Sequence, residues 1–539
     1  MIIKALTIEN FKGIREPVRI EFKPITLLFG PNSAGKSTIV QALHYIREIL
    51  ERNNVDADRS LGADESFDLG GFRNLVHKHD LSTRIRFRIE MSIGHGELQE
   101  YPTFVGNYQN FDTDLMGAHR LEVNFDLNEW VDVDTMWVEL EVGWSHLLGK
   151  PYLTSYSTGL NGAPVAGITC SDDGKRVRIS KLELRHPSLV NVHKINSEWD
   201  ILDELFHNVV NTKVVGEGAD LNLMLENVSG VLPVWGKGIS VPTECFSPSN
   251  NSDPQYFQSE VMEFLSYLSQ LIVGPGELLL KALNRGRYIG PIRKTPPRNY
   301  SPVNSRDDAR WSSGLAAWDL LYQRDLTFIN EVNRWLASDN RLNTGYSVKL
   351  KRYKELDLDG PAYLSLCTDG WLDEVDDIVN ELKRLPERKR LTLIEEDKHI
   401  EVQPHDIGIG ISQLLPVVVA ALDGKSQMVL VEQPELHIHP RIQAELGDLF
   451  IEAALGESGN SFIIETHSEH LLLRIMRRIR ESYQQKSDGM PLSPEAVGVW
   501  YVEQYDNKTV VREMLLNKQG ELVKAWPGGF FEEGLREVF

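Results

Sequence analysis

The sequence predicts an α/β protein in which the two ends of the chain build one nucleotide-binding head, with a mixed β-sheet flanked by helices and a large α+β insertion. Two observations predict this fold. A phosphate-binding motif at residues 30–37 follows a short apolar strand and opens a helix. Two further apolar strands, at 428–432 and 461–465, end in acidic residues near the other end of the chain.

Length and composition exclude several classes of protein. The 539 residues are 41% hydrophobic and 25% charged, which is ordinary for a soluble globular chain of three to four domain-sized units. Three cysteines are too few for a disulfide framework. The N-terminus lacks the pattern of a signal peptide, and the longest apolar run, 414–422, is about half a membrane span. We therefore expect a cytoplasmic protein without a membrane partner.

The net charge of −21 argues against general nucleic-acid binding, so such a site would need a local basic patch. Two candidates occur. Arg474, Arg477 and Arg478 fall on one face of a predicted helix, although ion pairing with nearby acids is an equally simple explanation. A second basic stretch at 285–306 is irregular and includes Arg293, Arg298 and Tyr300.

Four regions follow from the pattern of elements. We expect residues 1–95 to form the N-terminal part of the head and 96–285 an insertion or accessory region. Residues 286–388 are a helical linker region that returns to the head, and 389–539 form its C-terminal part with a distinct tail. Within these regions the sequence predicts a strand at 120–127, a loop at 146–174, and helices at 257–284, 314–338 and 371–385.

The phosphate-binding motif assigns a role to each of its residues. Backbone N–H groups of the loop and the helix N-terminus face anionic oxygens. Lys36 is expected to reach the β- and γ-phosphates of ATP, and Ser37 to ligate Mg²⁺. The remaining nucleotide-binding candidates are Asn32, Ser33, Ala34, Gly35 and the neighbouring hydroxyl of Thr38.

Acidic residues after the strand at 428–432 predict the catalytic chemistry. Glu432 is the candidate carboxylate for the Mg²⁺ shell. Gln433 occupies the next position, and an amide can orient water but cannot accept a proton at neutral pH. Either hydrolysis is slow, or Glu435 acts as the general base. A capping or loop role for Glu435 is an equally good alternative.

Two further polar residues complete the predicted site. His467 follows the strand at 461–465 and can bond to a γ-phosphate. Ser412 lies after Gly408 and Gly410 at the start of a helix, where a hydroxyl and free N–H groups form an anion site; taken alone, Ser412 would be a plain helix cap.

These motifs, in this order, resemble the ABC-type heads of SMC, RecF and OLD-family ATPases. The EQPELHIHP string at 432–440, YIGPIR at 288–293, LGGFRNLVHK at 69–78 and the closing WPGGFFEEGLREVF are similar to bacterial AAA-family ATPases with a DUF3696-type C-terminus. Within these, the chain most resembles the PtuA family, the ATPase subunits of Septu and retron anti-phage defence systems.

The resemblance implies ATP and Mg²⁺ as cofactors, and a homodimer or higher even-numbered oligomer joined through ATP. Ser412 of one subunit would reach the γ-phosphate of ATP held by Lys36 of the other. It also implies an HNH endonuclease partner and, in a retron cassette, a reverse transcriptase with its multicopy single-stranded DNA. The expected function is a slow, nucleotide-gated ATPase switch in anti-phage defence.

Three alternatives to this function are open. A RecF- or SMC-like DNA repair ATPase would share the head. An OLD-type nuclease would need a metal domain after the ATPase, but 72 residues follow His467 and carry no evident acidic triad. A transporter ATPase would need membrane-partner contacts that the sequence does not show.

Overall fold

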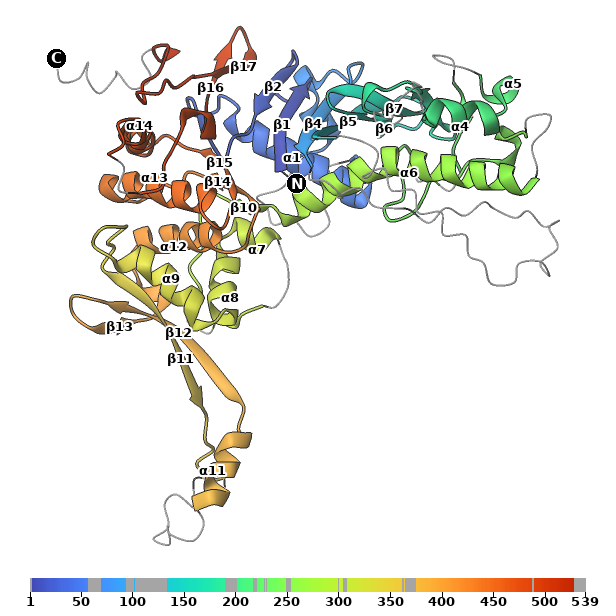
Figure 1. Cartoon of the computed structure of the whole chain (residues 1–539). Coiled ribbons are helices and arrows are strands. Elements are labelled where there is room, and N and C mark those ends of the chain that lie inside the picture. Colours follow the sequence, from blue (N-terminus) through green and yellow to red (C-terminus); the bar gives the residue numbers. More distant parts are fainter. Residues whose placement is uncertain are drawn as a thin grey trace.

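The computed structural model describes residues 2–56, 69–93, 101, 133–189, 201–216, 221–226, 228, 230–248, 254–298, 300–303, 308–360, 363, 375–486 and 489–527. Within these ranges the strands form three sheets, of eight, six and three strands. The eight-stranded sheet extends to one side of the head, and a hairpin projects from the head in another direction (Figure 1).

The six-stranded sheet is the core of the head. Its order is β10 (Arg287–Ile289), β14 (Met428–Glu432), β15 (Ser461–Glu465), β3 (Ile25–Phe29), β16 (Val497–Tyr505) and β17 (Lys508–Glu513). Neighbours from β10 to β16 are parallel, and β17 is antiparallel. Strand β3 comes from the N-terminal segment and lies between two C-terminal strands. The prediction of one α/β head built from both ends of the chain is therefore confirmed.

Both faces of this core sheet are buried, which explains why its strands are almost entirely apolar. Leu28 and Ile463 pack into the apolar cluster that contains α1 (Lys36–Arg52) and α6 (Pro254–Arg285). Leu27 and Ile464 point the other way, into the cluster built with the C-terminal helices. Those helices are α12 (Ile409–Leu422), α13 (Pro440–Leu455) and α14 (Glu469–Tyr483).

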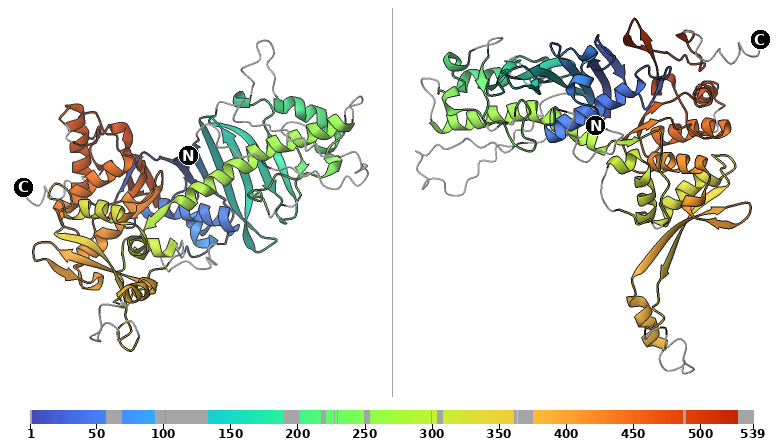
Figure 2. Two further views of the ribbon diagram at one scale, coloured as in Figure 1. Left: turned by 60° about the horizontal axis from the view of Figure 1, so that its bottom comes forward. Right: turned by 180° about the vertical axis from the view of Figure 1, so that it is seen from behind.

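The eight-stranded sheet is antiparallel and joins the N-terminal segment to the predicted insertion. Its order is β2 (Val18–Glu21), β1 (Ile2–Glu9), β4 (Ile85–Ser92), β5 (Thr135–Ser145), β6 (Lys150–Leu160), β7 (Ala163–Cys170), β8 (Val177–Leu182) and β9 (Leu223–Met224). Helix α6 crosses one face, and α4 (Ile201–Val209) packs on α6 (Figure 2). The expected boundary near residue 95 thus falls inside one continuous sheet.

The loop expected at 146–174 is wrong, because this segment forms the β6–β7 hairpin. Two of its Thr hydroxyl groups bond to carbonyls of neighbouring elements. Thr154 donates to the carbonyl of Glu141 at 3.0 Å, and Thr158 donates to that of Leu271 in α6 at 2.8 Å. The strand expected at 120–127 lies outside the described residues.

The linker region contains helices and a projecting hairpin. The helix expected at 314–338 is wrong as one element, because it divides into α8 (Leu315–Gln323) and α9 (Leu326–Ala337). The Asp325 side chain accepts a hydrogen bond from the Phe328 N–H and so starts a new helix. Strands β11 (Tyr346–Lys354) and β12 (Glu387–Glu395) form the projecting hairpin, with α11 (Val375–Arg384) at its far end (Figure 1).

Short elements complete the described ranges: α2 (Phe72–Leu75), η3 (His77–His79), η4 (Pro187–Leu189), α5 (Thr212–Val215), η6 (Thr243–Cys245), α7 (Asp308–Ser312), β13 (Ile400–Val402), η7 (Pro404–Asp406) and η8 (Pro494–Ala496). Strand β13 pairs with β12. Across those ranges, every helix is too short or too polar to cross a lipid bilayer.

Candidate nucleotide-binding site

The phosphate-binding loop joins the carboxyl end of β3 to the N-terminus of α1. Gly30, Ser33 and Gly35 all have positive φ angles, of 146°, 62° and 104°. A Cβ atom on Gly30 would lie 2.0 Å from the carbonyl oxygen of Val502, so only glycine fits between this loop and β16. The loop therefore has the strand-to-helix setting that its motif requires.

Lys36 lies inside this loop. Its Nζ donates to the carbonyls of Gly30 and Pro31, each at 3.0 Å, and lies 3.8 Å from Oε1 of Glu465. Only 4% of the residue is exposed. Burial lowers the pKa of Lys36, and the nearby carboxylates act in the opposite direction. The ammonium group is thus held where a phosphate bound by the loop would meet it.

Two glutamates face this lysine from neighbouring parallel strands. Glu432 ends β14 and Glu465 ends β15, and the two are register partners. Ser37 Oγ donates to Glu465 Oε2 at 2.8 Å, and the Tyr288 hydroxyl donates to Glu432 Oε1 at 3.0 Å. Sequence reasoning missed Glu465 and Tyr288. The signal for Glu465 was present, since both apolar strands end in glutamate.

The pKa values of both carboxylates are raised. Burial, followed by the charge of Glu465, raises the pKa of Glu432 to about 7. Burial also raises the pKa of Glu465, against the hydrogen bond from Ser37. A cation placed here would relieve this repulsion.

The oxygen atoms of Ser37, Glu432 and Glu465 are the hard ligands that Mg²⁺ prefers. No group of three or more His, Cys, Asp or Glu side chains in the described ranges is arranged as a metal cage of its own. Mg²⁺ in nucleotide sites takes most of its ligands from phosphates and water, so these few oxygens fit that use.

The turn after β14 connects Glu435 to His467. Gln433 has a φ of 45°, and its N–H donates to the Glu465 carbonyl at 2.7 Å. Glu435 accepts from the Thr466 hydroxyl and from the His467 N–H, both at 2.7 Å. Burial raises the pKa of Glu435, while burial and Lys36 lower that of His467. Both oxygens of Glu435 are therefore engaged in holding the turn that carries His467.

Ser412 lies in the first turn of α12. Its hydroxyl donates to the carbonyl of Ile409 at 2.8 Å. The neighbouring Gln413 pairs with the backbone of Arg293, donating to its carbonyl at 2.7 Å and accepting from its N–H at 3.0 Å. The segment 290–293 and the start of α12 are therefore one connected unit.

Arg293 links this unit to the acidic strand. Its guanidinium donates to the carbonyls of Glu432 at 2.5 Å and Gln433 at 3.2 Å, and 2% of the residue is exposed. Burial lowers its pKa to about 10, so it stays charged at neutral pH. The expectation that Arg293 could contact nucleic acid is wrong, because its side chain is enclosed.

The C-terminal hairpin supports the loop from the opposite side. Gln504 in β16 donates to the carbonyl of Ser33 at 3.0 Å, and Thr509 in β17 donates to that of Ala34 at 3.2 Å. Asn32 is exposed, and the buried Thr38 donates its N–H to the Gly35 carbonyl at 3.1 Å. Every predicted loop residue thus lies at the junction of the two chain ends.

The basic face of α14 is neutralised within the protein. Arg474 pairs with Glu445 and Asp448, and Arg478 pairs with Asp448 and Glu481. Arg477 also pairs with Glu481. The ion-paired alternative is confirmed for this face.

Two protein-family models match parts of the chain, and neither covers half of it. The family described as "AAA ATPase domain" matches residues 1–115, and the family described as "AAA domain, putative AbiEii toxin, Type IV TA system" matches residues 272–474. Chromosome partition proteins Smc from Halothermothrix orenii and Mycobacterium leprae are 43% identical over 47 residues. That stretch is 8% of this chain and 4% of theirs.

Solved SMC heads align along most of the chain at low similarity. The SMC head bound to the C-winged helix domain of ScpA has 11% identity and a TM-score of 0.38, covering 96% of this chain and 99% of that one. The SMC head from Thermotoga maritima has 10% identity and a TM-score of 0.34, covering 95% and 99%. The match at 1–115 contains the phosphate-binding loop, and the match at 272–474 contains the paired acidic strands and Ser412.

Proposed function

We propose that this chain binds and slowly hydrolyses ATP, and that two copies close around the nucleotide as a switch. The observation that carries the proposal is the convergence of Lys36, Ser37, Glu432 and Glu465 at one edge of the core sheet. Lys36 there bonds to loop carbonyls that a phosphate oxygen can replace. Mg²⁺, when bound, would neutralise phosphate charge beside Ser37 and Glu432.

Exposed apolar residues next to Ser412 support closure between two heads. Ile409, the first residue of α12, is 58% exposed, and Ile292, next to Arg293, is 75% exposed. The Arg293–Gln413 bonds hold these two segments side by side. Apolar side chains at this position suit burial against a second copy, which would bring Ser412 to the partner's phosphate.

Slow turnover follows from the residues after β14. Gln433 can orient a water but cannot take its proton. Glu435, the other candidate base, has both oxygens engaged by Thr466 and His467. A long-lived ATP state suits a switch better than a motor, because each nucleotide would hold one assembly for many seconds.

A role in anti-phage defence is the biological setting that we favour. The family matched at residues 272–474 is described as a putative AbiEii toxin, and the chain resembles PtuA-type ATPases. The switch would then control an HNH endonuclease partner and, in a retron cassette, act with a reverse transcriptase and its multicopy single-stranded DNA. The second candidate is a RecF- or SMC-like DNA repair ATPase, and a 47-residue stretch of the chain is similar to chromosome partition proteins Smc.

Light scattering after size exclusion, with and without ATP and Mg²⁺, tests the switch. We expect ATP to convert wild-type monomer to dimer. Lys36→Ala should lose both nucleotide binding and dimer. Ile409→Asp should keep nucleotide binding but stay monomeric, because it places a charge in the proposed interface. Val214→Asp, at a 52% exposed valine in α5, is the matched control and should dimerise normally.

ATP binding without any change of assembly would contradict the dimeric switch. Co-purification with the products of neighbouring genes then separates the two settings. An HNH endonuclease held in an ATP-dependent way supports defence, and preferential recovery of recombination proteins supports repair.

A further inference from the structure

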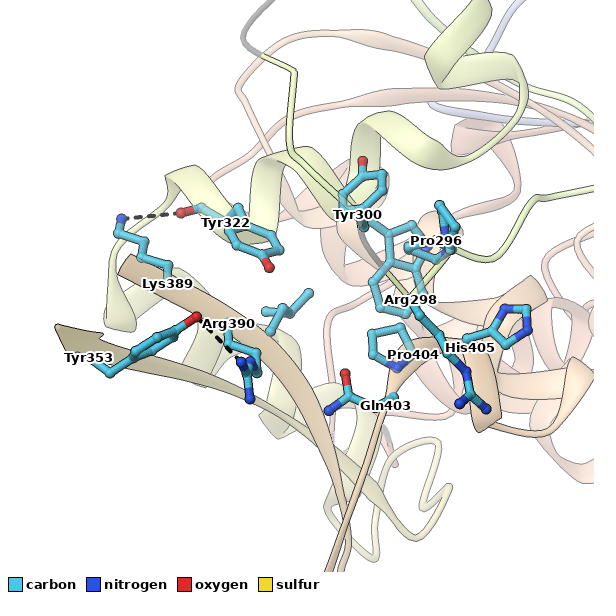
Figure 3. Close-up of a pocket in the computed structure, with 13 residues that line it drawn as sticks. Pro296, Arg298, Tyr300, Tyr322, Tyr353, Lys389, Arg390, Gln403, Pro404 and His405 are labelled. Atoms are coloured by element: carbon cyan, nitrogen blue, oxygen red, sulfur yellow. Dashed lines mark hydrogen bonds between the residues drawn. The ribbon is translucent and has the colours of Figure 1, made fainter. Parts of the chain in front are cut away.

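A cavity of about 210 Å³ lies at the root of the β11–β12 hairpin, away from the loop at 30–37 (Figure 3). Its lining comes from residues 296–298 and Tyr300, helix α8, the hairpin and residues 403–405. The volume is below the roughly 300 Å³ at which pockets for whole drug-sized ligands begin. It therefore suits one planar ring system with groups that extend outside.

The walls of the cavity are aromatic. Tyr300, Tyr322 and Tyr353 line it together with Trp318. The rings of Tyr300 and Tyr322 are tilted by 51° with centroids 6.3 Å apart, so they do not stack face to face on each other. Trp318 is fully buried, and its indole N–H has no hydrogen-bond partner within the described ranges. The pocket thus has aromatic side chains along its walls.

The Tyr300 wall is rigid. Its hydroxyl donates to Asp319, which is 5% exposed, and accepts from Arg310 at 2.8 Å. Because these bonds fix the ring, binding a flat ligand against it costs little ordering of the protein.

Positive charge surrounds the mouth. Arg298, Lys389 and Arg390 line the cavity together with His405, and Figure 3 labels all four. Lys389 Nζ donates to the Tyr322 carbonyl at 3.2 Å, and Arg390 lies 3.5 Å from the Tyr353 hydroxyl. Arg298 pairs with Asp406, but its side chain is 71% exposed. Exposed pairs of this kind are weak and can exchange for another anion.

Further basic residues lie along the two strands of the hairpin, away from the head. Strands β11 and β12 carry seven basic and two acidic residues, in a chain whose net charge is −21. Lys351 lies directly opposite Arg390, and Arg352 directly opposite Lys389. Like charges in this register destabilise a hairpin. Lys351 forms an ion pair with Glu401, and Arg352 forms one with Glu387 at 3.9 Å. These pairs reduce the repulsion, and the two strands still carry an excess of positive charge.

We propose that this pocket holds one unpaired nucleobase of a single-stranded nucleic acid, with the flanking phosphates on the basic hairpin. Aromatic ring faces bind any base by stacking. Arginine and lysine side chains around the pocket bind the phosphates. A paired base in a duplex is stacked inside the helix and cannot enter such a cavity. This site does not depend on the ATP switch.

Fluorescence anisotropy with the full chain tests the proposal, using a dye-labelled oligonucleotide of about 16 nucleotides, the upper end of known single-strand site sizes. We expect Tyr353→Ala and Arg390→Ala each to weaken binding about tenfold. Tyr353→Phe keeps the ring and should bind as the wild type does. Lys213→Glu, at an exposed lysine in α5, controls for net charge. The Lys36→Ala background should behave identically, which separates this test from the ATP site.

Photocrosslinking of a 5-iodouracil strand should label Tyr322 or Tyr353. Three results would overturn the proposal: an equal affinity for duplex of the same length, binding that Tyr353→Ala leaves unchanged, or equal binding of polyglutamate, which would make the surface a site for acidic peptides. Binding of free mononucleotide with no binding of the strand would also overturn it.

Discussion

At the scale of single residues, the main feature of the site is a pair of buried glutamates whose negative charges repel each other. Glu432 and Glu465 end adjacent strands, and both are buried beside one lysine. Without a bound cation the native state therefore favours keeping a proton on Glu432. This preference has a measurable consequence for stability.

The free energy of unfolding of the nucleotide-free protein should fall as the pH rises from about 4.5 to about 7. The pKa of Glu432 is about 7 in the folded state against its ordinary value of 4.5, so the folded state binds more protons in this window. The loss is complete above the folded pKa and is at most about 3 kcal/mol. Urea unfolding at both ends of the window, without Mg²⁺, measures it. Glu432→Gln should flatten the difference, and an unchanged slope would contradict this assignment.

Arg293 should act on stability more than on nucleotide affinity. Arg293→Met leaves the carbonyls of Glu432 and Gln433 without their charged donor, which should lower the free energy of unfolding by about 1.5–3 kcal/mol. Its guanidinium does not bond to the loop at 30–37, so the ATP Kd should change little. Denaturant unfolding and ATP titration measure the two effects. A large loss of affinity with full stability would show that Arg293 acts on nucleotide directly.

Glu465 was missed although its strand ends in the same way as that of Glu432, whereas the structural role of Arg293 could be seen only in the fold. Lys36, Ser37, Glu432 and His467 belong to local patterns of strand, turn and helix, and these patterns can be read in one stretch of chain. Arg293 acts on residues about 140 positions away through tertiary packing. Its neighbours in sequence are basic, which suggested an exposed surface, and only the packing shows that it is buried.

At the scale of elements, a helix cap can divide a segment that its apolar periodicity alone predicts to be one helix. The apolar spacing continues from α8 into α9, but Arg324 is extended and Asp325 caps the second helix. For β6 the sequence predicted a loop, because the segment is rich in Ser, Thr and Gly. It forms a strand that pairs with its chain neighbours β5 and β7. Buried apolar strands such as β3, β14 and β15 were predictable since their composition alone is decisive.

Asp325→Ala should lower the stability of the α8–α9 region by about 1 kcal/mol, the usual cost of losing a helix N-cap. The reason is that the Phe328 N–H loses its acceptor. Thermal unfolding followed by circular dichroism measures the change. Asp325→Ser retains a capping oxygen and should recover most of the loss. Equal stability of Asp325→Ala and the wild type would mean that packing alone divides the two helices.

At the scale of the whole molecule, the two ends of the chain depend on each other. Strand β3 lies between β15 and β16, and side chains of Gln504 and Thr509 hold the phosphate-binding loop. A chain that ends at residue 495 keeps Lys36, Glu432 and His467 but loses β16 and β17. We expect it to lose ATP binding, as measured with a fluorescent ATP analogue. Adding the missing segment as a separate peptide is the control, and binding by the truncated chain alone would contradict this dependence.

The position of β3 also determines when, during synthesis of the chain, the core sheet can be completed. When the ribosome releases the first strands, the partners of β3 are more than 400 codons away, so the loop at 30–37 is synthesised long before the strands on either side of it. Such distant pairings fold slowly. An incomplete nascent chain cannot assemble the pocket, and translation must therefore pass β16 before the cell contains a working copy.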